Sequence, residues 1–256
     1  APGSKVVTDY LAKAGLLPAL EALRFPPTWF PASPQFGNYV EVFRQIPLLL
    51  YLGNTVLVAL LSLAGVLLTG ILAAYAFARL RFPGREALFM GFLALMMIPL
   101  PVYLVPSYTI LFRLGWIDTY AAMIVPWIAN IFAIFLLRQH FRTIPRSLYE
   151  AAKLDGCSDF MYLWRIVLPL SRSVLVTVIL FDVISSWNSF MWPLVVTNSE
   201  NMRVLQVGLS YFNQEQASNY PLLMAASTFC TLPLLLLFVL AQRQIVSSYS
   251  RSGLKD

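Results

Sequence analysis

The stretch that decides how this chain folds is Glu150-Ala-Ala-Lys-Leu-Asp-Gly156, which is followed after nine residues by Ile166-Val-Leu-Pro169. It lies in a polar, basic segment between two long apolar segments, residues 119–137 and 173–197. If the apolar segments cross a membrane, the polar segment between them is a loop that meets the aqueous phase. The stretch therefore predicts a membrane protein whose cytoplasmic loop contacts a partner protein.

The composition supports a membrane protein. Hydrophobic residues make up 59% of the chain, charged residues only 12%, and the mean hydropathy is +0.70, whereas about 25% of a soluble domain is charged. Several apolar segments are long enough for a span of about 20 residues. We predict an all-α, polytopic helical bundle with an external N-terminal segment at 1–47 and one transmembrane domain at 48–256. The five expected spans lie near residues 48–78, 87–112, 119–137, 173–197 and 222–241.

The distribution of positive charge predicts the topology, because cytoplasmic loops are rich in Lys and Arg. The segments at 79–85 and 138–172 and the C-terminus are rich in these residues, so all three are expected in the cytoplasm. The N-terminus is then external. Because the sequence begins with Ala1 rather than Met, we expect a sixth span upstream; a five-span protein with an external N-terminus is the alternative. The net charge of +6 thus reflects topology and not nucleic-acid binding.

Catalytic, metal and redox sites are not predicted. Cys157 lies in the loop and Cys230 within a span, so the two cannot plausibly pair, and His140 is the only histidine. The sequence has no G-x-S-x-G or H-E-x-x-H motif, no paired carboxylates within the spans and no glycine-rich phosphate-binding loop. We therefore expect no enzymatic activity and no cofactor on this chain.

The loop at about 141–172 is predicted to contain two short helices. Ser147-Leu-Tyr-Glu150 fits a capping box at the start of the first helix. Gly156 fits a left-handed cap at its end. The second helix should begin near Ser158 and stop before Pro169. On this basis alone, Glu150 could serve only to cap its own helix.

Two adjacent alanines give the first helix a second interpretation. Ala151 and Ala152 are good helix formers and could be present for that reason alone. They also leave a low-profile surface that can enter a cleft in another protein. The position of the loop among cations and the full E-A-A-x3-G-x9-I-x-L-P spacing favour this docking function.

With that spacing, the chain resembles the permease subunits of type I ABC importers. It is most similar to their carbohydrate-uptake branch, in particular to the second permease subunit of maltose-type transporters, over about residues 26–255. The stretches that carry the resemblance to this branch are Gly53-Asn-Thr55, Ala73–Phe82, Phe135–Gln139, Ile144-Pro145, Trp187-Asn188, Trp192-Pro-Leu194 and Gln242-Arg243.

The resemblance implies a subunit of a binding-protein-dependent importer in the prokaryotic plasma (inner) membrane, surrounded by lipid. It would pair with a second homologous permease subunit, while two ATPase subunits, which hold ATP and magnesium, dock beneath the loop. An extracytoplasmic solute-binding protein would deliver a carbohydrate.

The chain departs from the family at Cys157, where the family commonly has alanine, and at Ser189, where it usually has an acidic residue. The residues implied to couple to the ATPase are Glu150, Ala151, Ala152, Asp155, Gly156, Ile166, Leu168 and Pro169.

A second group of residues is predicted to line the translocation path. Asp182 is the one carboxylate deep within a predicted span, and such residues usually face a cavity or a partner. It could instead be buried against a backbone group or against a cation of the partner subunit. Trp187, Asn188, Phe190 and Trp192 follow it, and aromatic faces with an amide suit a sugar. The alternative for the tryptophans is a role as interfacial anchors.

Two further features concern the spans themselves. Small residues at Gly65, Thr69 and Gly70 allow close helix packing, and the prolines between 99 and 106 disfavour a regular helix there. A stand-alone secondary transporter is the alternative function. It is disfavoured because the spans hold essentially one carboxylate and show no inverted repeat. A structural scaffold is a further alternative, but it requires that the loop bind no ATPase.

Overall fold

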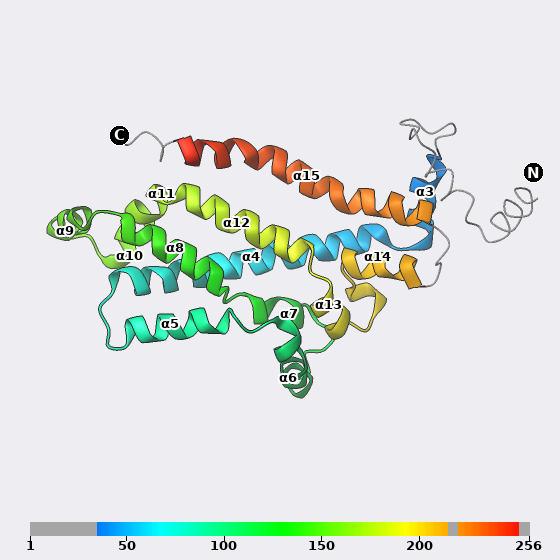
Figure 1. The fold of residues 1–256 in the computed structure, drawn as a ribbon, viewed down its shortest axis with the longest axis horizontal. Helices are drawn as coiled ribbons and strands as arrows, with labels where there is room; N and C mark the ends of the chain where they lie inside the picture. Colours follow the sequence, from blue (N-terminus) through cyan, green and yellow to red (C-terminus); the bar gives the residue numbers. More distant parts are fainter. Residues whose placement is uncertain (1–34, 215–219, 251–256) are drawn as a thin grey trace, which may run out of the picture.

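The computed structural model describes residues 35–214 and 220–250, and over these residues it contains helices and no strands. Residues 1–34 of the predicted external segment lie outside the described residues. Four long helices run in roughly the same direction and form the body of the molecule (Figure 1). They are α4 (Leu48–Arg79), α8 (Ile131–Thr143), α12 (Arg172–Trp187) and α15 (Tyr220–Ser250).

Three helical stretches in the described ranges are long and apolar enough to cross a membrane. They are Leu48–Arg79, Tyr120–Thr143 and Pro221–Val239. Two bent helix pairs raise the number to as many as five if each pair is one span. The predicted helical membrane bundle is therefore confirmed, and its spans include broken helices.

The second predicted span is one of the bent pairs. Helices α5 (Arg85–Leu95) and α6 (Leu100–Arg113) meet at 101°. The bend follows from Pro99 and Pro101, which cannot donate the backbone hydrogen bonds that would continue α5. Pro106, by contrast, lies inside α6. The expected irregularity of this segment is confirmed.

The fourth predicted span, 173–197, is shorter than expected. Helix α12 ends at Trp187, and a separate short helix, α13 (Met191–Val196), follows. The loop helices that precede α12 meet it at 81° and form the second bent pair. The long helix of this span therefore ends ten residues before the predicted limit at 197, because the chain turns at Asn188 and Ser189.

The packing of α4 against α8 forms the centre of the bundle. A Cβ atom on Gly65 would lie 2.8 Å from Cβ of Ile128, so only glycine allows this approach. The Thr69 hydroxyl donates to the carbonyls of Gly65 and Ile128. At Gly70, a Cβ would lie 3.7 Å from Cβ of Ala133, which is ordinary contact. The small residues in α4 therefore set the helix spacing, as predicted.

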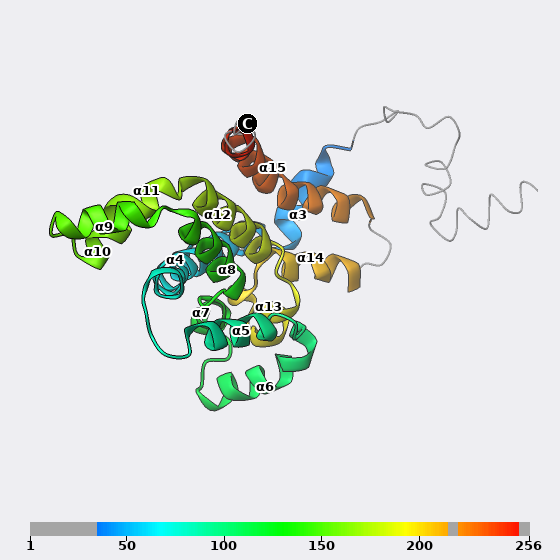
Figure 2. The ribbon, with the colours of Figure 1, turned by 60° about the vertical axis from the view of Figure 1, so that its left-hand side comes forward.

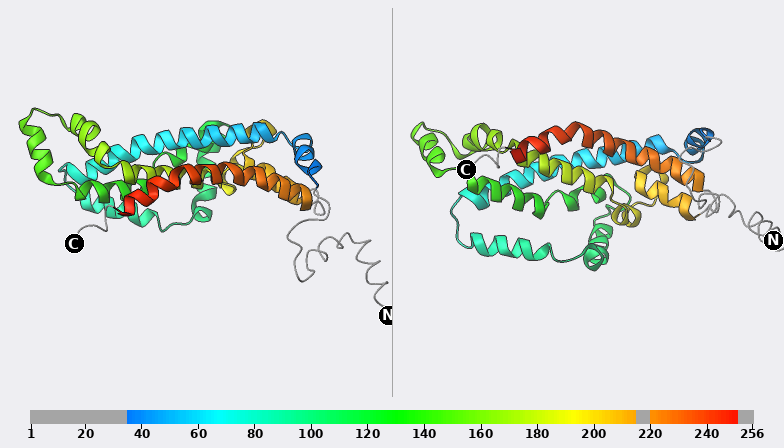
Figure 3. Two further views of the ribbon diagram at one scale, coloured as in Figure 1. Left: turned by 90° about the horizontal axis from the view of Figure 1, so that it is seen from above. Right: turned by 45° about the horizontal axis from the view of Figure 1, so that its top comes forward.

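The two ends of the bundle differ. Helix α9 (Arg146–Leu154) projects at one end, and α3 (Gly37–Gln45) and α14 (Leu205–Gln214) lie at the other (Figures 2 and 3). Helix α3 was not predicted; it packs on α15, where the rings of Phe43 and Phe229 are 4.9 Å apart. The remaining short helices are α7 (Tyr120–Ile124), η1 (Val125–Trp127), α10 (Asp159–Tyr162), η2 (Leu163–Val167), α11 (Leu168–Leu170) and η3 (Glu200–Met202).

Candidate coupling loop and solute cavity

Helix α9 begins at Arg146, directly after Pro145, and its N-terminus has no side-chain cap. The predicted capping box is therefore wrong. Instead of folding back to the first turn, the Glu150 carboxylate pairs with Arg146, whose Nε lies 3.0 Å from Oε1. Because both side chains are exposed, this pair stabilises the helix only slightly. The carboxylate of Glu150 therefore remains open to a partner.

One face of α9 is free and the other is buried. Glu150 and Ala151 are exposed, and Leu154 is 90% exposed. Ala152, one position along from Ala151, is buried in the cluster that contains the cores of α4 and α8. The two alanines thus have different environments: Ala152 seats the helix on the bundle and Ala151 lies on its open surface.

The end of α9 follows the predicted cap. Gly156 has φ of +76°, and the Cys157 N–H donates to the carbonyl of Ala152 at 2.9 Å. This pattern satisfies the last carbonyls of a helix and favours glycine at the left-handed position. Asp155 is the last residue before it and is exposed. The structure confirms the predicted end of the helix.

The second loop helix begins as predicted but continues further. The Ser158 hydroxyl accepts a hydrogen bond from the Met161 N–H at 3.2 Å. The chain then passes through α10, the π-helical η2 and α11, and it breaks at Ser171. The predicted stop before Pro169 is wrong, because the chain stays helical from Asp159 to Leu170 and Pro169 follows directly on the π-helical η2. Ile166 and Leu168 pack into the core cluster, and Pro169 is exposed.

A carboxylate ties the loop to α4. Asp159 Oδ1 accepts hydrogen bonds from the hydroxyls of Tyr149 at 2.9 Å and of Tyr75, on α4, at 3.3 Å. Lys153 Nζ lies 3.2 Å from the same oxygen, and this bond raises the pKa of the Lys153 ammonium. One acidic side chain therefore joins α9, α10 and α4.

Arg79, the last residue of α4, makes a second connection. Its Nη2 donates to the carbonyls of Phe141 at 2.8 Å and Ile144 at 2.6 Å, just before α9. In the sequence this arginine indicated topology and formed part of the Ala73–Phe82 stretch. Its contacts show that it also fixes the entry to the loop.

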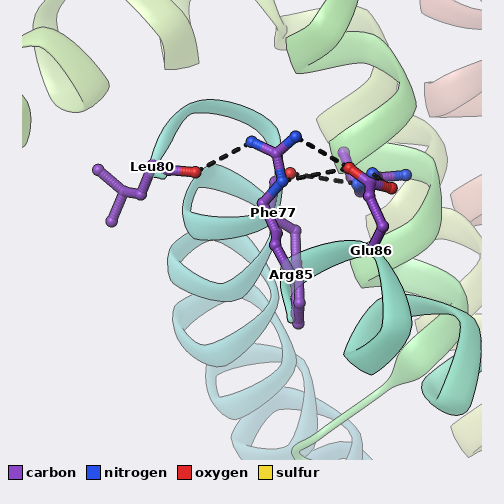
Figure 4. Close-up of polar contacts among 5 residues, drawn as sticks. Phe77, Leu80, Arg85 and Glu86 are labelled. Carbon is purple, nitrogen blue, oxygen red and sulfur yellow. Dashed lines mark hydrogen bonds and ion pairs between the residues drawn. The ribbon is translucent and has the colours of Figure 1, made fainter. Parts of the chain in front are cut away.

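The buried Arg138 joins α8 to the start of α5. Its Nη2 lies 2.6 Å from Oε2 of Glu86, and its guanidinium carbon lies 3.8 Å from the centre of the Phe89 ring. Its Nε donates to the carbonyl of Phe77. Arg85 pairs with the other oxygen of the Glu86 carboxylate at 2.9 Å (Figure 4). Sequence reasoning missed this cluster, since the residues are far apart along the chain.

A cavity of about 920 Å³ lies among α4, α6, α12 and α13. Four of the predicted path residues line it: Asp182, Asn188, Phe190 and Trp192. Trp187 does not line this cavity; it is buried, and its Nε1 donates to the carbonyl of Cys230 on α15 at 3.0 Å. Trp187 therefore holds α12 against α15.

Asp182 is the one charged residue among the described residues that line the cavity, and the other polar groups there are neutral. Asp182 is 9% exposed, and its Oδ2 has no hydrogen-bond partner within the described part of the chain. No Lys or Arg lies among the described residues that line the cavity. Aromatic rings, hydroxyls and amides make up much of the rest, including Trp127, Tyr103, Ser62, Ser107, Ser185, Ser186, Ser189 and Asn130.

A second polar hub, which the sequence analysis did not single out, lies at the end of the molecule opposite α9. Asn54, only 4% exposed, donates to the carbonyls of Asn201 at 2.7 Å and Arg203 at 2.9 Å. Its Oδ1 accepts from the hydroxyl of Tyr120 at 2.8 Å. The Gly53-Asn-Thr55 stretch indicated similarity to a family, but the contacts of its asparagine depend on residues nearly 150 positions away.

Asp118 stabilises the same end of the molecule. Its Oδ1 accepts from the backbone N–H groups of Ser199 at 3.0 Å and Asn198 at 2.9 Å. The hydrogen bond from Ser199 is the main reason why the pKa of the Asp118 carboxyl is lowered. The positive φ of 62° at Asp118 places the side chain for these contacts.

Comparison with known proteins gave consistent matches. Residues 65–251 match the sequence model of a family described as "Binding-protein-dependent transport system inner membrane component". The arabinooligosaccharides transport system permease protein AraQ of Halalkalibacterium halodurans is 31% identical over 248 residues, which cover 96% of this chain and 89% of that protein. The sn-glycerol-3-phosphate transport system permease protein UgpE of Pectobacterium atrosepticum is 32% identical over 241 residues, 91% of this chain and 86% of that protein.

A third relative and a solved structure extend the comparison. The sulfoquinovosyl glycerol transport system permease protein SmoH of Agrobacterium fabrum is 34% identical over 232 residues, 90% of this chain and 81% of that protein. A chain in the crystal structure of a bacterial ABC transporter that imports the acidic polysaccharide alginate has the same fold. Its TM-score is 0.76 at 23% identity, and the match covers 94% of both chains.

Proposed function

Since the chain belongs to the family of binding-protein-dependent transport system inner membrane components, we propose that it forms one half of the solute path of a sugar-importing ABC transporter. The other half is a second, homologous permease subunit. The stand-alone secondary transporter is not favoured, because the family is described as a component of binding-protein-dependent transport systems and the relatives are named transport system permease proteins. The chain is thus an integral inner-membrane transport component.

The observation that carries the mechanism is the seating of α9. Its open face, with Glu150, Ala151 and Leu154, is available to an ATPase subunit that binds ATP and magnesium. Tyr149 of α9 bonds to Asp159, which in turn accepts from Tyr75 of α4. Closure of the ATPase dimer would displace α9, and the rigid connections would carry the displacement into the spans. Hydrolysis itself belongs to the partner, and no cofactor is assigned to this chain.

The assignment of α9 to ATPase docking also gives the orientation of the chain in the membrane. The end that carries α9 and the Arg79–Arg85 turn faces the cytoplasm, in agreement with the positive-inside rule. The opposite end, where Asn54 and Asp118 order the connections, faces the extracytoplasmic solute-binding protein. A periplasmic binding protein with a bound alginate pentasaccharide accompanies one transporter of the same fold, which supports this partner.

The chemistry of the cavity favours an uncharged saccharide. Trp127, Phe190 and Tyr103 offer aromatic faces to sugar C–H groups, and the free oxygen of Asp182 can accept from a hydroxyl. An acidic sugar would meet this carboxylate without a Lys or Arg from the described lining of the cavity. The relatives' names include neutral and anionic solutes alike, so the cavity chemistry is what selects between them.

The test is uptake and ATP hydrolysis in liposomes that contain the transporter purified through a tag on this chain, with its binding protein added. Leu154→Glu should weaken ATPase docking by about tenfold or more, because loss of a buried interface anchor costs about 2 kcal/mol. Uptake and hydrolysis should fall together. Leu114→Glu, which changes another exposed leucine outside the loop, is the matched control.

Two outcomes separate the parts of the proposal. If Leu154→Glu transports as well as Leu114→Glu, the docking assignment for α9 is wrong. If an acidic oligosaccharide is imported as efficiently as a neutral one of equal length, the importer assignment stands and the neutral-substrate assignment fails.

A further inference from the structure

A second cavity, with a volume of about 1070 Å³, opens at the α9 end between α9 and the turn that joins α4 to α5. It is separate from the solute cavity, with which it shares no lining residue. Four arginines and a single carboxylate line this crevice. These residues are Arg79, Arg81, Arg85, Arg146 and Glu86.

The Glu86 carboxylate does not neutralise all of the positive charge in the crevice, because each of its oxygens is already paired with an arginine. Glu86 Oε1 pairs with Arg85 at 2.9 Å, and Oε2 pairs with Arg138, from outside the crevice, at 2.6 Å (Figure 4). Arg81 is exposed and makes no hydrogen bond or ion pair within the described ranges. Arg79 has a buried Nε without an acceptor in the same part of the chain. Arg146 is paired with Glu150 and Arg85 with Glu86, so the positive charge left without a carboxylate partner in the described ranges is that of Arg79 and Arg81.

The start of α5 adds backbone donors to the same crevice. Gly84, with φ of +77°, precedes the helix, and no side chain caps its N-terminus. The first N–H groups of a helix have no partner within it, and the helix dipole makes this end attractive to anions. Residues 84–87 line the crevice. Arginine side chains and an uncapped helix N-terminus together suit a phosphate group.

The surroundings of the crevice distinguish between possible phosphate ligands. It lies where α4 ends and α5 begins, at the level at which a membrane span leaves the bilayer. Leu80 and Leu88, beside the arginines along the chain, expose 39% and 54% of their surface. A headgroup with acyl chains would use both the charge and the apolar surface, whereas free phosphate or an acidic protein segment would use only the charge.

We propose that this crevice binds the phosphate headgroup of an anionic phospholipid from the leaflet on the α9 side. The lipid phosphate would lie between Arg81 and Arg79, near the N-terminus of α5, with Arg146 of α9 on the opposite wall. Basic pockets between helices at the cytoplasmic side of membranes are typical sites for such headgroups. The ligand would bridge the α4–α5 turn and the helix assigned to ATPase docking. The lipid site itself does not depend on that assignment.

The experiment measures lipid binding to the transporter purified through a tag on this chain. Phosphatidylglycerol or phosphatidylcholine is titrated into the detergent-solubilised, delipidated protein, and bound lipid is counted by native mass spectrometry. Arg81→Gln should bind phosphatidylglycerol about fivefold more weakly, the effect of about one basic residue near an anionic surface. Arg81→Lys should bind nearly as well as wild type. Arg142→Gln, which removes an exposed arginine outside the crevice, should behave as wild type.

The proposal fails if phosphatidylglycerol and phosphatidylcholine bind equally, or if Arg142→Gln lowers binding as much as Arg81→Gln. Release of the lipid by millimolar inorganic phosphate at constant ionic strength would assign the crevice to free phosphate instead. Loss of a co-purifying ATPase subunit from Arg81→Gln, without a change in lipid binding, would assign it to an acidic protein surface. None of these readouts requires transport, so they leave the test of the proposed function untouched.

Discussion

Replacement of Asn54 by alanine should be among the most damaging single changes at the end of the molecule opposite α9. The side chain is 4% exposed, and it makes three hydrogen bonds of 2.7, 2.9 and 2.8 Å to Asn201, Arg203 and Tyr120. A hydrogen bond contributes about 1 kcal/mol net, so the loss is about 3 kcal/mol. For domains of 150–250 residues this corresponds to a fall in Tm of about 6–12 °C.

The assay is thermal unfolding of the purified transporter in detergent, together with hydrogen exchange of peptides that cover residues 198–205. Exchange should increase there, because Asn54 orders the carbonyls of Asn201 and Arg203. The matched control is Asn198→Ala, since Asn198 is exposed and uses its backbone N–H, not its side chain, to contact Asp118. Equal shifts in Tm for the two variants would refute the reasoning that the buried amide holds these segments together.

Two further predictions concern the stability effect of added Cβ atoms at glycines and the pH dependence of the Asp118 carboxylate. Gly65→Ala should lower the free energy of unfolding by about 1–3 kcal/mol through overpacking against Ile128. Gly91→Ala, where an added Cβ meets nothing within 4 Å, should be neutral or stabilising; thermal unfolding of both variants checks this, and a reversed order would contradict it. Because the pKa of Asp118 is lowered, its contribution is present above the ordinary carboxyl pKa and is lost as pH falls through the lower folded value. The difference in Tm between wild type and Asp118→Asn should therefore shrink on acidification, and a constant difference would argue against this role.

Local sequence signals predicted the loop well where the physical cause is local. Gly156 ends α9 because the left-handed conformation favours glycine, and Ser158 caps the next helix through its own hydroxyl. The prediction failed at Glu150 and Pro169. Glu150 had two local partners within reach, and Arg146 one turn earlier replaced the cap. Pro169 was expected to end its helix, but the π-helical η2 precedes it and the chain stays helical to Leu170.

The predicted residues of the solute path show the same contrast between what local sequence indicates and what packing decides. Asp182 was identified from its position in the sequence, because a carboxylate stands out within an apolar span. It lines a cavity, as predicted. Trp187 and Trp192 looked equivalent in the sequence, yet only Trp192 lines that cavity. Which residue of a helix faces a cavity depends on where the neighbouring helices lie, and α15 is more than 30 residues further along the chain.

The sequence by itself determined that this is a helical membrane protein, which segments are apolar enough to span, and which loop carries a short helix that ends at a glycine, because hydropathy, charge and capping are properties of short segments. The tertiary structure alone decided that Asn54, Asp159 and Arg138 act as junctions, and that Arg79 and Arg81 share a crevice with α9. These groupings arise because helices that are distant along the chain pack together and bring into contact residues that lie 50 to 150 positions apart, and no local pattern encodes such distances.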